Sequence, residues 1–69
     1  MNGQDLIKRF TYHPVKGDQE QRYVLLRTAA GEFADKITEF VPESIERANA
    51  IQKLEEAVMW VNAAIARNE

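Results

Sequence analysis

Apolar side chains recur at spacings of three and four residues along two long stretches of the chain, with a short break between them. This spacing places them on one side of an α-helix. The pattern predicts long helices over residues 19–41 and 43–67. The expected inner positions are Tyr23, Leu26, Ala30, Phe33, Ile37 and Phe40 in the first helix and Ile51, Leu54, Val58, Val61 and Ile65 in the second.

Two local signals set the boundaries of these helices. Asp18 fits an N-cap with Gln21 three residues later, a variant of the capping box, so the first long helix should begin near residue 19. Pro42 is compatible with the first turn of the second, and Glu43 there suits the helix dipole. Because the connection is short, the two helices should run antiparallel as a hairpin.

The N-terminal part of the chain predicts a short helix followed by an ordered loop. Residues 2–10 can form a helix that is too short to be stable without tertiary support. In residues 11–18, Pro14 favours an extended residue before it, and Gly17 allows positive φ. The sequence therefore predicts one all-α domain over residues 1–69.

The 43–67 helix has a second apolar surface that an isolated hairpin leaves uncovered. Chains this small rarely gain enough stability from their own core. The sequence has no cysteine and only one histidine, which excludes disulfides and a zinc site as supports. We therefore expect the chain to assemble with copies of itself. The residues of this second surface are Ala50, Ala57, Trp60, Ala63 and Ala64.

Charge and hydropathy narrow the range of partners. The net charge of −2 argues against DNA, whose binding depends on many cationic contacts. The longest nearly apolar run, residues 57–66, is far too short to cross a membrane, so we expect no membrane contact and a cytosolic location. Residues 8–27 contain five Lys or Arg against two acids, a balance of +3, and an anionic ligand is expected there.

No motif for catalysis or for a cofactor occurs, so we expect neither an enzyme nor a cofactor. Glu55 and Glu56 are adjacent on a helix and do not converge on one atom. His13 fits a loop residue that makes backbone or ligand hydrogen bonds better than a titrating switch. Trp60 fits a subunit-interface anchor better than a base-stacking residue.

The 11–18 loop brings an aromatic ring close to several cations. Tyr12 lies near Lys16, and Arg22 and Arg27 follow in the next helix. A ring with mobile cations suits a nucleotide, whose bases stack and whose phosphates pair with guanidinium groups. A second hypothesis is equally open on this chemistry: Tyr12 only plugs the end of the hairpin and the cations keep the chain soluble.

Two segments, residues 9–19 (RFTYHPVKGDQ) and 53–68 (KLEEAVMWVNAAIARN), carry a resemblance over nearly the whole chain. They are similar to the hairpin-domain sponges with which bacteriophages counter CBASS immunity. A related branch inhibits Thoeris immunity and has an added domain. The resemblance implies a homohexamer of interlocked hairpins in the host bacterial cytoplasm. It also implies binding of cyclic dinucleotides such as 3′,3′-cGAMP, without cleavage, in pockets shared between protomers.

The resemblance also implies roles for individual residues. The ligand's bases would stack between Tyr12 and a basic residue of another subunit, Lys16 or Arg27, with His13 in the same loop. Arg67 is the candidate for a separate cyclic trinucleotide site. Two alternatives remain open: a sponge for cyclic trinucleotides or cyclic ADP-ribose isomers, and a helical adaptor that binds proteins rather than nucleotides.

Overall fold

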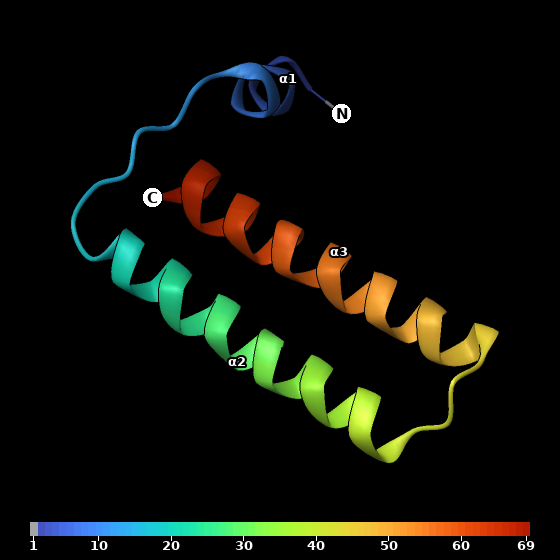
Figure 1. The fold of residues 1–69 in the computed structure, drawn as a ribbon. Helices are drawn as coiled ribbons and strands as arrows, with labels where there is room; N and C mark the ends of the chain where they lie inside the picture. The colour runs from blue at the N-terminus through green and yellow to red at the C-terminus, as the bar shows by residue number, and fades with distance from the viewer. Residues whose placement is uncertain (1) are drawn as a thin grey trace.

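The computed structural model describes residues 2–69, which form three α-helices and no β-strand. Helix α1 spans Gly3–Phe10, α2 spans Gln19–Phe40 and α3 spans Ile45–Asn68. Helices α2 and α3 lie side by side and antiparallel, and α1 lies near the end of α3 (Figure 1). The expected all-α hairpin is confirmed. The domain expected over residues 1–69 stays a prediction, and residue 1 lies outside the described residues.

Helix α1 is short but well capped. The Asp5 backbone N–H donates to Asn2 Oδ1 at 2.9 Å, and the Asn2 backbone N–H donates to Asp5 Oδ2 at 3.3 Å. These reciprocal bonds satisfy donors that an uncapped helix leaves open. Lys8 and Arg9 in the last turn suit the negative end of the helix dipole. Local chemistry thus explains how eight residues form a helix.

Helix α2 begins at Gln19 as expected, but the predicted capping box at Asp18 is wrong. Asp18 is the N-cap residue, yet its side chain accepts no hydrogen bond from a backbone N–H of the first turn. Its Oδ1 atom instead accepts a hydrogen bond from Arg22 Nε at 3.2 Å. The cation one turn into the helix competes successfully for the carboxylate, because charge-assisted hydrogen bonds are the stronger kind.

Helix α3 begins two residues later than the sequence predicted. Its N-cap is Ser44, whose Oγ accepts from the Arg47 backbone N–H at 3.0 Å, so Pro42 belongs to the connection rather than the first turn. Arg47 Nη1 also donates to the carbonyls of Thr38 (3.3 Å) and Val41 (3.1 Å). One arginine therefore satisfies carbonyl groups at the end of α2 and helps to close the turn.

The hairpin packs along a narrower stripe than the sequence predicted. In α2 the residues turned toward α3 include Ala30, Ala34 and Ile37, whereas Phe33 is 56% exposed and Phe40 is 75% exposed. Placing those two phenylalanines on the inner face was wrong, because a strict heptad drifts around a straight helix and the small Ala34 takes the contact. In α3 the expected positions Ile51, Leu54, Val58 and Ile65 are half-buried, whereas Val61, like Leu26 of α2, is exposed.

A single chain is one helix layer thick, at 44 × 28 × 12 Å. Its accessible surface is 5692 Å², against about 4400 Å² for a typical monomer of 7.9 kDa. No apolar side chain of residues 2–69 is fully buried, and Trp60 is 59% exposed. These values support the expected self-association, which stays a prediction. None of the helices in the described part is long and apolar enough to cross a bilayer.

Candidate functional site

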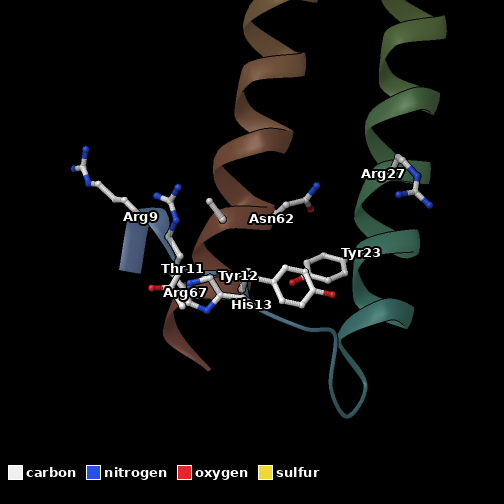
Figure 2. A pocket seen from close by; sticks show the side chains of 10 residues that line it. Arg9, Thr11, Tyr12, His13, Tyr23, Arg27, Asn62 and Arg67 are labelled. Carbon is white, nitrogen blue, oxygen red and sulfur yellow. The ribbon is translucent and has the colours of Figure 1, made fainter. Parts of the chain in front are cut away.

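A pocket of about 460 Å³ lies at the open end of the hairpin, where the loop, α1 and the end of α3 meet. Figure 2 shows Tyr12 and Tyr23 between α2 and α3, with Asn62 projecting from α3. The pocket is wide enough for a small organic ligand. It is lined by Arg9, Thr11, Tyr12, His13, Tyr23, Arg27, Asn62, Ala63, Ala66 and Arg67.

Tyr12 is the most accessible aromatic side chain of the pocket. It is 84% exposed, although it comes directly after α1 in an ordered loop. A tyrosine that plugged the hairpin would be covered, so this exposure does not fit the end-plug hypothesis for an isolated chain. Tyr23, which the sequence placed on the α2 inner face, borders the same pocket from α2. The structure thus offers two aromatic surfaces for a flat ligand.

His13 fixes the course of the loop next to Tyr12. Its Nε2 lies 2.8 Å from the Lys8 carbonyl oxygen. Since a carbonyl can only accept, Nε2 must carry the proton. The hydroxyl of Thr11 likewise donates to the Ile7 carbonyl. Both bonds tie the loop to the last turn of α1.

Three arginines give the pocket its charge. Arg9 comes from α1, Arg27 from α2 and Arg67 from α3, and none of them forms an ion pair within residues 2–69. No Asp or Glu is among the residues that line the pocket. Unpaired guanidinium groups around a pocket without carboxylates attract anions and suit phosphate oxygens. Arg67 also borders three neighbouring hollows.

Lys16 lies apart from the other predicted site residues. Its Nζ donates to the main-chain oxygen of Glu69, and it borders a smaller hollow of about 200 Å³ beside His13 and Arg67. The structure therefore brings Tyr12, His13, Arg27 and Arg67 to one pocket and leaves Lys16 outside it.

Glu69 is the centre of a polar cluster that includes Lys16, Gln19 and Arg22. Arg22 forms a two-pronged ion pair with the Glu69 carboxylate, with Nη1 to Oε2 at 2.8 Å and Nη2 to Oε1. Hydrogen bonds from Arg22 and then from Gln19 lower the pKa of Glu69 to about 2. The same pair raises the pKa of Arg22 above its ordinary value. Both groups are consequently charged at neutral pH.

Asn62, Arg9 and Tyr23 border the pocket but were not among the predicted site residues. Asn62 interrupts the apolar 57–66 run, which was a signal for a polar role. Its Oδ1 is buried and accepts no hydrogen bond from residues 2–69. Buried amide oxygens without a partner are uncommon in folded proteins. Arg9 was visible only as part of the basic segment, because its approach to Arg67 depends on how α1 folds back.

Comparison with known families adds an independent observation. The family model described as "Acb2/Tad1, hairpin domain" matches residues 3–66. Comparisons with curated proteins and with solved structures give no significant match. The family match covers α1, the loop, α2 and nearly all of α3, and it therefore includes every element that borders the pocket. The chain belongs to the Acb2/Tad1 hairpin-domain family, the anti-CBASS and anti-Thoeris sponges that bind cyclic nucleotide signals.

Proposed function

We propose that this chain is a phage immune-evasion protein that sequesters cyclic dinucleotides such as 3′,3′-cGAMP and so blocks activation of CBASS effectors. The family supports a sponge for cyclic nucleotide signals. The pocket supports the narrower choice of ligand. Its site residues are Tyr12, His13, Arg27 and Arg67, joined by Arg9 and Tyr23.

The single observation that carries the proposal is a pocket with two tyrosines, three unpaired arginines and no carboxylate. A cyclic dinucleotide has two flat bases and two anionic phosphates. Tyrosine rings stack on bases of any kind, and guanidinium groups form paired hydrogen bonds with phosphate oxygens. Each chemical feature of the ligand thus meets a matching group of the protein.

Self-association is part of the proposal. The pocket is open on one side, and a symmetric ligand suits a site to which two protomers contribute the same residues. The uncovered apolar side chains of α2 and α3, among them Phe33, Met59 and Trp60, provide surface for that assembly. We propose a homohexamer. Native mass spectrometry with and without ligand measures the number of chains directly.

Binding alone is sufficient for this function. A sponge lowers the free concentration of a messenger when its binding sites outnumber the messenger, and no bond needs to break. The family acts by binding rather than catalysis. We propose that this chain likewise releases its ligand intact, and that it works in the cytoplasm of the infected bacterium, where the messenger is made.

Calorimetric titration of the purified protein tests the ligand. The panel contains 3′,3′-cGAMP, other cyclic dinucleotides, a cyclic trinucleotide, cyclic ADP-ribose isomers and linear dinucleotides of the same bases. We expect heat on titration with cyclic dinucleotides and unchanged ligand after heat denaturation of the complex. Binding of only the trinucleotide or the ADP-ribose isomers would move the chain to another ligand class. Flat titrations throughout would reject the sponge and favour a protein-binding adaptor.

A further inference from the structure

The junction between the loop and α2 contains the one buried residue among residues 2–69. Gln19 is 2% exposed. Its Oε1 accepts from the Lys16 backbone N–H at 3.1 Å, and its Nε2 donates to Glu69 Oε1 at 3.3 Å. A glutamine at the first position of a helix is usually solvated. Here both ends of its amide have partners, so its burial is fully compensated.

Glu69 receives hydrogen bonds from three side chains that come from the loop and the first turn of α2. Gln19 and Arg22 donate to its carboxylate, and Lys16 Nζ donates to its main-chain oxygen. We refer to Lys16, Gln19, Arg22 and Glu69 as the Glu69 clamp. These contacts join residues that are 47 to 53 positions apart in sequence. The clamp therefore fastens the loop end to the end of α3.

The clamp holds one end of the loop, and α1 holds the other. The α1 end is held by the His13 bond to Lys8 and the Thr11 bond to Ile7. Tyr12 lies between Thr11 and His13, at the α1 end of the loop, and is itself 84% exposed. Its own side chain therefore contributes little packing that could fix its position. The course of the loop decides where this ring stands.

The basic side chains at this end of the hairpin fall into two groups, those that belong to the clamp and those that border the pocket. Arg22 forms ion pairs with Asp18 and Glu69, and Lys16 Nζ donates to the main-chain oxygen of Glu69. Arg9, Arg27 and Arg67 have no such partner within the described residues and border the pocket. The first two cations after Tyr12, Lys16 and Arg22, are thus engaged in structural contacts, and Arg9, Arg27 and Arg67 remain for an anion.

We propose that Gln19, Arg22 and Glu69 are positioning residues of the ligand pocket, which hold the loop so that Tyr12 faces Tyr23 and Arg27 before the ligand arrives. This inference rests on the proposed function. When the loop is already ordered, ligand binding does not include the entropic cost of ordering it. The affinity is therefore higher. None of the three residues needs to touch the ligand.

Glu69→Gln and Gln19→Met test the proposal, since both preserve size and remove clamp bonds. The matched control is Glu56→Gln, which removes the exposed Lys53–Glu56 ion pair of α3 without a contact to the loop. Amide hydrogen exchange at Lys16, whose N–H donates to Gln19 Oε1, should accelerate in both clamp variants, while exchange in the middle of α2 and α3 stays unchanged. Affinity for 3′,3′-cGAMP should fall about tenfold, and the control should match the wild type.

Charge reversal supplies a readout that a general loss of stability would not produce. Arg22→Glu alone should weaken binding, and the double variant Arg22→Glu with Glu69→Arg should recover loop protection and most of the affinity. Clamp variants that bind as tightly as the wild type, or that leave loop exchange unchanged, would overturn the proposal while the sponge function stands. A wild-type protein that binds no cyclic nucleotide would instead remove the proposed function itself, and the positioning role with it.

Discussion

The two ends of the hairpin are closed in different ways. At the connected end, residues 41–44 join α2 to α3, and Ser44 and Arg47 complete the turn with bonds to residues at most nine positions away. At the open end no chain connects the helices, and the Glu69 clamp joins them through side chains. The first end is fixed by covalent connectivity and local capping. The second depends on polar side chains, and it is there that the arginines and tyrosines gather.

Because the two ends are closed differently, one end should mainly affect stability and the other mainly ligand binding. Altering a turn that is closed locally should lower stability and have little effect on a ligand at the opposite end of both helices. The open end has the opposite character, because its exposed side chains contribute little to packing and much to the surface that a ligand meets. Substitutions at the two ends should consequently move different measurements.

The largest effect on binding should come from Tyr12→Ala. Loss of base stacking should weaken affinity for 3′,3′-cGAMP by about 5- to 150-fold, from ~1–3 kcal/mol per stacked base. The melting temperature and oligomeric state should stay unchanged, since the ring is 84% exposed. Calorimetry measures the affinity and the melting temperature, and native mass spectrometry measures the oligomeric state. Tyr12→Phe is the control and should bind nearly as the wild type does. If Tyr12→Ala disrupted the oligomer but kept its affinity for the ligand, Tyr12 would have a structural role instead.

A smaller loss of affinity should follow Arg27→Gln. Removing one charge-assisted bond to phosphate should cost about tenfold in affinity and reduce its dependence on salt concentration. Titrations at two salt concentrations check this. Arg47→Gln at the connected end is the matched control, because its guanidinium binds only backbone carbonyls. Equal affinity losses in both variants would mean that the two ends are not functionally distinct.

At the connected end, Ser44→Ala should change stability and leave binding intact. Loss of the N-cap bond to Arg47 should lower the free energy of unfolding by ~1 kcal/mol. Thermal unfolding at fixed protein concentration measures the change, since assembly makes the midpoint concentration-dependent. Ser44→Asp, which can still cap, should recover most of the loss. A marked fall in ligand affinity for Ser44→Ala would contradict the separation of the two ends.

The smallest effect concerns pH. The pKa of Glu69 is lowered from 4.5 to about 2 by its hydrogen bonds with Arg22 and Gln19. The charged form is thus favoured in the folded state, so the stabilisation is fully present above pH 4.5 and is lost as pH falls through 2. The difference in the free energy of unfolding between wild type and Glu69→Gln should therefore become smaller as the pH falls from 4.5 to 2. Denaturant unfolding at several pH values measures it, and a constant difference would refute the pKa assignment.

The sequence predicted the parts of this molecule that depend on local chemistry. Apolar spacing and the breakers Pro14, Gly17 and Pro42 were sufficient to locate the three helices and their order. The family resemblance was confirmed over residues 3–66. Loop chemistry also singled out Tyr12, which the structure places at the pocket.

The parts that sequence reasoning missed depend on partners far away in the chain. Asp18 is the N-cap residue of α2, but Arg22 rather than a backbone N–H binds its carboxylate, and Gln19 donates to a carboxylate 50 residues later. Spacing alone did not distinguish Phe33 from its neighbour Ala34 as the contact with α3, because that depends on how closely two helices approach. Lys16 was grouped with Tyr12 by proximity in sequence, whereas the fold directs its ammonium group to Glu69.

Backbone amide chemical shifts during titration with 3′,3′-cGAMP test most directly that the open end is the ligand site. Resonances of Tyr12, Tyr23 and Arg27 should move with increasing ligand until they saturate, while those of residues 41–44 stay in place. Unchanged spectra at saturating ligand, or shifts confined to the connected end, would contradict this location of the ligand site.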